Sequence, residues 1–123
     1  MSVPIPYAAP SHIPVTTTFT IDGYRITRYL GVVRGLTVRS PTIVQGFLGR
    51  LKTIVGGQIG AYTEMCEQTR QTAFDLLIQH AESIGANAIV GVRYDASEIG
   101  GNVVSATEVL CYGTAVFIEA IPA

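Results

Sequence analysis

Apolar and polar residues along the chain repeat with a period of two in some segments, and this period predicts strands. Residues 24–34, which follow the turn signal Asp22-Gly23, read YRITRYLGVVR. There Ile26, Leu30 and Val32 fall on one predicted face and Thr27, Tyr29 and Val33 on the other. Residues 88–94 and about 103–119 predict two further strands. Because residues 97–102 include two glycines, we expect a turn there that makes the last two strands a hairpin.

Between the first and second strands the apolar period changes to that of two helices. Ser40 and Pro41 suit a helix start, because Ser caps free N–H groups and Pro favours the first helical position. One stripe then ends at Gly56-Gly57 and consists of Ile43, Val44, Phe47, Leu48, Leu51, Ile54 and Val55. A longer helix is predicted at about 61–84, with a stripe of Tyr62, Met65, Cys66, Thr69, Ala73, Leu76, Leu77, Ala81 and Ile84. The order β-α-α-β-β predicts one α/β domain of the two-layer α+β kind.

The third predicted strand is apolar on both faces. From residue 109 to 118 it reads VLCYGTAVFI, without a charged side chain. Leu110, Tyr112, Val116 and Ile118 share one face, and Val109, Cys111, Ala115 and Phe117 share the other. Two helices can cover one face of a three-stranded sheet, whereas a face open to water would carry polar residues. We therefore expect the second face to be buried against other copies of the chain.

Composition and charge support a globular subunit and narrow its partners. Of 123 residues, 48% are hydrophobic and 14% are charged, and the net charge of −1 excludes disorder and general nucleic-acid binding. Residues 21–55 carry a net charge of +5 and residues 56–123 a net charge of −6. Such halves suit a head-to-tail ring, although the charges could equally mix over one folded surface. The basic half contains no recognisable nucleic-acid motif, so nucleic acid is not an expected partner.

Residues 1–20 contain no charged side chain and four of the six prolines. We interpret them as an extended arm, either a free tail or a segment that packs on a neighbouring subunit, followed by a single domain at 21–123. The arm lacks the basic start of a signal peptide, and its prolines exclude a membrane helix. The expected compartment is the cytoplasm, where Cys66 and Cys111 would be reduced thiols.

Four short segments carry a resemblance to a known family. They are YLGVVRG at 29–35, IVGG at 54–57 with GAY at 60–62, GANAIVGVRYD at 85–95 and GTAV at 113–116. Together they resemble the YbjQ family, also called UPF0145 or DUF74, whose members are described as heavy-metal-binding. The resemblance covers roughly residues 18–119, and the arm before it is longer than the family leads us to expect. It implies a subunit like that of dodecin, with a sheet of strand order 1-3-2, in a ring-shaped homopentamer.

The resemblance makes a soft divalent metal ion the cofactor to test, and Cys66 and Cys111 are the candidate ligands. Soft metals need converging thiolates or imidazoles, yet no Cys-x-x-Cys or His-x-x-x-His spacing occurs. Cys66 and His80 lie about 21 Å apart along one predicted helix, so they cannot share an ion within a subunit. The plain alternatives are that both cysteines are buried small hydrophobes and that His80 is a helix-end residue favoured by the dipole. His12 falls on the arm.

Enzymatic interpretations find less support than binding. The chain has no Gly-x-Ser-x-Gly elbow, and its glycine loop at 56–60 lacks the Lys-Ser/Thr of a P-loop. Glu64 and Glu67 are one helical turn apart but are expected to be solvated. We expect a non-enzymatic homo-oligomer, most simply a pentamer, that binds a metal or small ligand. The alternative is a scaffold ring that presents surfaces to a protein partner.

Overall fold

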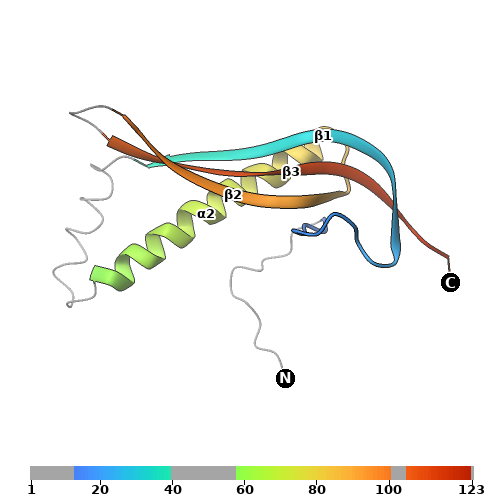
Figure 1. Cartoon of the computed structure of the whole chain (residues 1–123), viewed down its shortest axis with the longest axis horizontal. Coiled ribbons are helices and arrows are strands. Elements are labelled where there is room, and N and C mark those ends of the chain that lie inside the picture. The colour runs from blue at the N-terminus through green and yellow to red at the C-terminus, as the bar shows by residue number, and fades with distance from the viewer. Residues whose placement is uncertain (1–12, 40–57, 101–104, 123) are drawn as a thin grey trace, which may run out of the picture.

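The computed structural model describes residues 13–39, 58–100 and 105–122, and within them one helix packs against a three-stranded sheet. The elements follow in the order β1 (Tyr24–Arg39), α2 (Gln58–Ser83), β2 (Ala88–Gly100) and β3 (Ser105–Ala120), as Figure 1 shows. The strands are antiparallel in the order β1-β3-β2. The α+β architecture and the 1-3-2 order are thereby confirmed, while the ring remains a prediction. The helix predicted before residue 56 lies outside the described residues.

Two strands extend beyond the segments that apolar alternation predicted. β1 continues past residue 34 to Arg39, and β2 continues past residue 94 to Gly100. Every described residue of β2 from Arg93 onward is exposed, but from Asp95 to Gly100 each pairs in register with β3. Backbone pairing with β3 keeps this segment extended, although its exposed side chains give no alternating pattern from which a strand could be predicted. The predicted turn therefore starts later than residue 97, and residues 101–104 lie outside the described ones.

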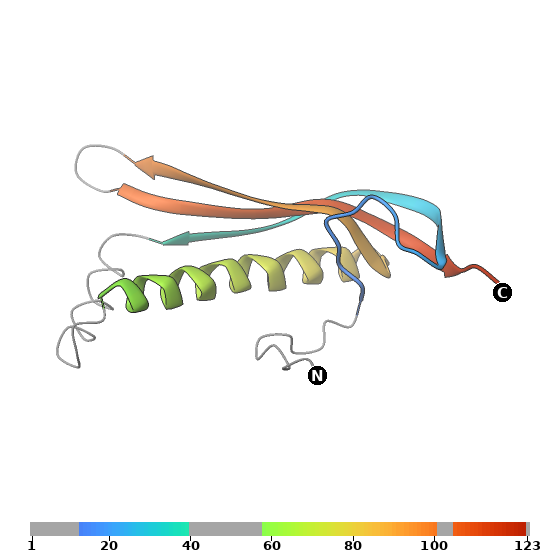
Figure 2. The ribbon, with the colours of Figure 1, turned by 60° about the horizontal axis from the view of Figure 1, so that its bottom comes forward.

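The helix α2 covers one face of the sheet and lies mainly beneath β1, as the side view in Figure 2 shows. Gly35 of β1 makes this approach possible. A Cβ built on Gly35 would collide with the carbonyl oxygen of Ala73 and lie 2.6 Å from the backbone nitrogen of Leu77. Both atoms belong to helix backbone, so only the absence of a side chain lets α2 sit this close.

The described part of α2 confirms the predicted long helix but not all of its buried stripe. Thr69, Ala73, Leu77 and Ala81 are buried. Leu76, Ile84 and Cys66 are exposed, contrary to the prediction. The helix contacts the sheet along a narrow line because its backbone lies against β1, so the edges of the predicted stripe face solvent. Within the described residues, no helix has the length and apolarity to cross a membrane.

Two register shifts in β1 change which of its residues face the helix. They lie between Ile26 and Arg28 and between Tyr29 and Gly31, and each changes the simple alternation expected for a strand. Val33 is fully buried, while Val32 is 72% exposed. Val32 shares a face with Ile26 as predicted, because the two shifts cancel between them. The predicted positions of Tyr29 and Leu30 are wrong, because Tyr29 pairs opposite Val116 on the face of Val32, and Leu30 packs against the cluster beneath α2.

The two faces of β3 carry two separate apolar clusters, as the sequence predicted. Val109, Cys111 and Ala115 join the cluster beneath α2, together with Val33, Leu77 and Ile89 among others. Val116 and Ile118 join a second cluster on the opposite face with Ala88 and Val90. Ile21 and Ile26 pack against this second cluster and cover one end of that face.

The described end of the arm is built into the sheet of its own subunit. Val15 forms a parallel bridge with Ile89 of β2. The Thr16 amide donates to the Ile89 carbonyl at 3.0 Å, and the Val92 amide donates to the Thr16 carbonyl at 3.0 Å. Ile13 is buried in the cluster beneath α2. This segment therefore covers the outer edge of β2 as far as Val92. It does not extend along the rest of that edge.

Candidate functional site

Cys111 lies at the centre of the sheet, on the face that α2 covers. It pairs with Gly35 of β1 on one side and with Tyr94 of β2 on the other. Its side chain is fully buried, in the same cluster as Ala73 and Leu77 of the helix. The central strand places it there, because odd-numbered residues of β3 in this stretch face the helix.

Tyr94 stands opposite Cys111 in the register of β2 with β3. Burial raises the pKa of the Cys111 thiol to about 11, although the neighbouring Tyr94 phenol acts in the opposite direction. Burial also raises the pKa of Tyr94 to about 12, with a further contribution from the Cys111 charge. Both groups are consequently protonated at neutral pH, and Cys111 is neither a thiolate nucleophile nor a ready metal ligand.

Charged helix residues border Tyr94 on its exposed side. The guanidinium carbon of Arg70 lies 5.4 Å from the centre of the Tyr94 ring, a cation–π distance. The Arg70 charge favours the phenolate and lowers the pKa of Tyr94, whereas the Glu67 charge raises it. These opposing effects are smaller than that of burial, so the phenol keeps its proton.

Cys66, the other candidate ligand, lies in a different environment. It is exposed on α2, seven residues before Ala73, whose carbonyl oxygen lies over the Gly35–Cys111 pair. Seven residues of helix span about 10 Å. The structure therefore places the two thiols at different levels of the helix–sheet interface, one on the surface and one inside it.

Two buried threonines place polar groups in the interface between α2 and the sheet. The apolar periodicity of the sequence did not predict what their hydroxyls contact. Thr69 of α2 donates its hydroxyl to the Met65 carbonyl at 2.8 Å and accepts from the Arg39 Nε at 3.3 Å. Thr37 of β1 is also buried, and its hydroxyl has no hydrogen-bond partner in the structure. This end of the helix–sheet interface is thus more polar than the end near Ala81.

His80 does not join the thiols. Its Nδ1 accepts a hydrogen bond of 3.1 Å from the backbone amide of Arg34 in the edge strand β1. An accepting Nδ1 carries no proton, so the ring satisfies a strand amide that has no sheet neighbour. The sequence predicted a helix-end position for His80 but could not show this contact. His12 lies outside the described residues.

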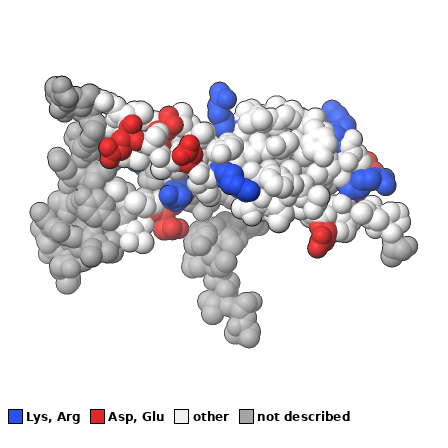
Figure 3. Space-filling model, viewed as in Figure 1, with Lys and Arg blue, Asp and Glu red and all other residues white. Residues whose placement is uncertain are grey.

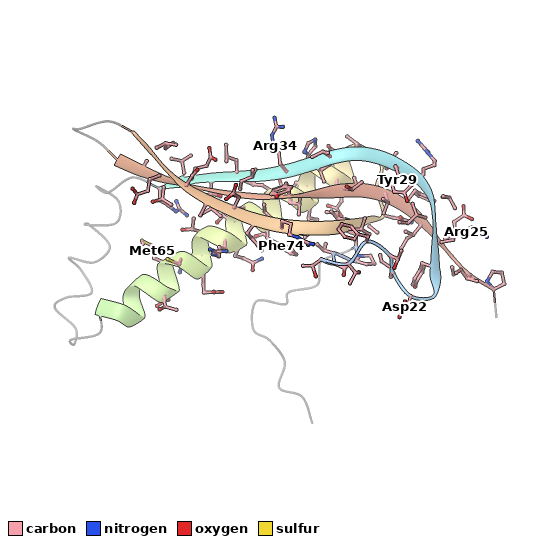
Figure 4. All side chains as sticks on the ribbon, in the orientation of Figure 1. Asp22, Arg25, Tyr29, Arg34, Met65 and Phe74 are labelled. Carbon is pink, nitrogen blue, oxygen red and sulfur yellow. The ribbon has the colours of Figure 1, made fainter. Side chains whose placement is uncertain are left out.

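The face of the sheet opposite α2 leaves a row of large apolar side chains in water. They are Tyr29, Val32, Leu36, Val38 and Tyr112, which lie on this face by the pairing of β1 with β3. We call this set the outer sheet face. The exposed Arg34, labelled in Figure 4, pairs with Tyr112 and so belongs to the same face.

Acidic side chains are concentrated toward one end of the described fold. On the side shown in Figure 3, most acidic side chains lie toward the end where β2 finishes and β3 begins. Asp95, Glu98 and Glu108 belong to this end, whereas Arg25 and Arg28 lie on the first half of β1. Charges of both signs occur at each end, because Arg39 lies opposite Thr107 beside Glu108, and Arg25 pairs opposite Glu119.

A hollow of about 280 Å³ lies beside the arm, and it makes a weaker site. Pro14, Thr16, Thr18, Thr20, Ile21 and Asp22 line it. The hydroxyls of Thr16 and Thr18 bond to each other at 2.8 Å, and Thr18 donates to the Thr20 carbonyl at 2.6 Å. The hydroxyls of Thr16 and Thr18 therefore bond to each other and to the arm backbone.

Comparison with known proteins gives the chain its relatives. The YbjQ family model, described as "Putative heavy-metal-binding", matches residues 13–119. The chain belongs to the YbjQ family. A UPF0145 protein of Legionella pneumophila is 58% identical over 104 residues, which are 85% of this chain and 96% of the relative. A UPF0145 protein of Solibacter usitatus is 52% identical over 112 residues, covering 91% of this chain and 96% of that protein.

A solved structure supports the YbjQ-family fold independently. The crystal structure of a DUF74-family protein of unknown function from Pediococcus pentosaceus aligns with a TM-score of 0.58. The alignment covers 87% of this chain and 98% of that one at 21% identity. At this identity the likeness establishes the fold alone.

The described residues do not fit the metal centre that the family description implies. No three His, Cys, Asp or Glu residues among them converge as an ion site. Cys111 is enclosed and protonated, and Cys66 lies about two helical turns away from its level. A soft metal needs deprotonated sulfur or imidazole at about 2.0–2.3 Å. Within one subunit, these residues do not supply it.

Proposed function

We propose that this YbjQ-family chain is the non-catalytic subunit of a cytoplasmic homo-oligomer, and that its outer sheet face is the contact between copies. The observation that carries the proposal is the exposure of that face. Tyr29 and Val32 are each 72% exposed, Leu36 and Val38 are 46% and 47% exposed, and Tyr112 is 37% exposed. Soluble domains rarely leave several large apolar side chains on one face in water unless that face binds something.

The free energy gained by burying the outer sheet face favours a closed ring over a dimer. Fully burying one such side chain contributes roughly 1.5–3 kcal/mol, so the exposed parts of five contribute about 4–8 kcal/mol. Association itself costs about 4–15 kcal/mol in lost freedom and ordering. A contact that buries this face of only one partner is marginal against that cost, whereas in a closed ring every subunit makes two contacts.

The charge distribution supports unlike surfaces meeting head to tail. Arg25 and Arg28, in the first half of β1, lie apart from the acidic end of the β2–β3 hairpin, whereas Arg39 lies beside Glu108. A heterologous contact brings such regions together, while a two-fold contact repeats the same patch on both partners. A ring of five is the form that the family resemblance implies, and such a ring presents repeated surfaces to a protein partner.

Binding of a small ligand or a soft divalent metal ion is the second candidate. The observation that favours it is the accessibility of Cys66, which is exposed on α2. An exposed thiol can meet donors of a neighbouring copy, so a metal site of the assembly would be built between subunits. Elemental analysis of the purified oligomer, with and without Cys66→Ser, separates this candidate from a ring that only presents surfaces.

Sedimentation of the whole chain tests the proposed assembly. The wild type is expected to sediment as a multiple of its 13.1 kDa chain at micromolar concentration. Val32→Asp places a charge in the outer sheet face and should shift the population toward the monomer. Gln79→Asp, which adds the same charge at an exposed position of α2, serves as the matched control. A monomeric wild type, or a Val32→Asp protein with unchanged mass, would refute the proposal.

A further inference from the structure

The position of Cys111 leads to an inference that contradicts the role of metal ligand that the sequence predicted for this residue. We propose that Cys111 is a structural thiol, and that soft metal ions reach it only when the domain opens. Such ions then act on this protein as destabilising agents rather than as a resident cofactor. The inference does not depend on how the copies assemble.

Among the described residues, the surroundings of Cys111 contain no donor set for a soft ion. Its strand neighbours are Gly35, which has no side chain, and Tyr94, which carries a phenol. The rest of its cluster is aliphatic, with Val33, Leu77 and Ala115 among its members. Soft ions select thiolates, thioethers and imidazoles. Cys111 therefore offers one sulfur and a phenol, and no second soft ligand.

Access to Cys111 is closed by helix backbone. The strand pair Gly35–Cys111 lies directly beneath Ala73 and Leu77, where even one added methyl group would collide with backbone atoms. The sulfur belongs to a side chain with no exposed surface. A metal ion with its hydration shell is much larger than a methyl group, so it can bind only after α2 separates from the sheet.

Whether a metal ion raises or lowers the melting temperature depends on which state of the chain it binds. A ligand that binds the folded state raises the melting temperature, and a ligand that binds the opened or unfolded chain lowers it. A native metal site and a sealed thiol therefore predict shifts in opposite directions. Cys66 must be removed first, because its exposed thiol could bind metal in either state.

Thermal unfolding of the Cys66→Ser chain in increasing Cd²⁺ is the test, with the protein in its own assembly. We expect the melting temperature to fall by about 5 °C for each tenfold rise in Cd²⁺ above its dissociation constant for the unfolded chain. Cys66→Ser with Cys111→Ala is the matched control, and there the fall should disappear. A thiol reagent should find no reactive sulfur in native Cys66→Ser and one in guanidinium.

The opposite result overturns the inference. A rise in the melting temperature of the Cys66→Ser chain with Cd²⁺, lost when Cys111 is also replaced, would place a native metal site at Cys111. Rapid reaction of the thiol reagent with native Cys66→Ser would equally contradict the sealed position. Should the double variant not fold, the direction of the shift in Cys66→Ser and its thiol count decide the question by themselves.

Discussion

Gly35→Ala tests the close approach of α2 to β1, which positions the whole helix–sheet interface. The added Cβ would collide with the Ala73 carbonyl oxygen and lie 2.6 Å from the Leu77 nitrogen and 2.9 Å from the Leu76 Cβ. Ordinary contact begins near 3.4 Å, so the helix must move away by about an ångström or more. The backbone conformation of Gly35 is one that alanine also adopts, so the cost is purely steric.

The expected cost is at least about 3 kcal/mol. Overpacking of a core costs about 1–3 kcal/mol when side chains can yield, and here the obstructing atoms are backbone. Moving α2 also loosens the contacts of the fully buried Ala73 and Leu77. Since domains of this size have a total stability of about 5–15 kcal/mol, such a loss is large. It corresponds to a fall of roughly 12 °C in melting temperature.

Urea unfolding followed by circular dichroism, at one fixed protein concentration, measures this free energy. Gly113→Ala is the control: its Cβ would lie 3.0 Å from methyl groups of Ile89 and Val92 and from the Val90 carbonyl. The methyl groups can turn aside, so we expect a smaller loss than for Gly35→Ala. A Gly35→Ala protein within about 0.5 kcal/mol of the wild type would refute the reasoning.

Two further outcomes follow from polar groups. Asn87 donates to the Ile118 carbonyl at 3.0 Å and accepts from the Ile118 amide at 2.7 Å. Asn87→Ala should therefore lower the free energy of unfolding by about 2–3 kcal/mol, as measured by thermal unfolding. An unchanged melting temperature would contradict this prediction. The pKa of Cys111 is raised to about 11 in the fold, against about 8.5 unfolded, so its contribution is fully present below pH 8.5 and is lost as pH rises toward 11. That loss is about 3 kcal/mol, and denaturation of Cys111→Ala should lack this part of the alkaline slope.

Some features of the candidate site follow from the local sequence pattern, and others depend on how the helix packs on the sheet. The two-sided character of β3 was evident because alternation along one strand is a local property. It correctly predicted that Cys111 is buried. The same reasoning placed Cys66 in a buried stripe and was wrong, because burial on a helix depends on how wide a line the sheet contacts.

The sequence by itself determined the order of the strands and of the described helix, the apolar nature of β3 on both faces, and the family. Each of these follows from the period of side chains along one segment, or from short matching segments. Only the tertiary structure decided that Tyr29 shares a face with Val32, because a bulge between Tyr29 and Gly31 shifts the alternation of β1.

The pairing of Tyr94 with Cys111 was likewise decided only in three dimensions. The two residues are far apart in sequence, and nothing in either strand fixes which residues stand opposite each other until the register forms. The close approach of α2 to Gly35 was also decided only by the tertiary structure, because it is a distance between two elements. Local patterns specify which face a side chain occupies, and the packing of elements specifies what it meets there.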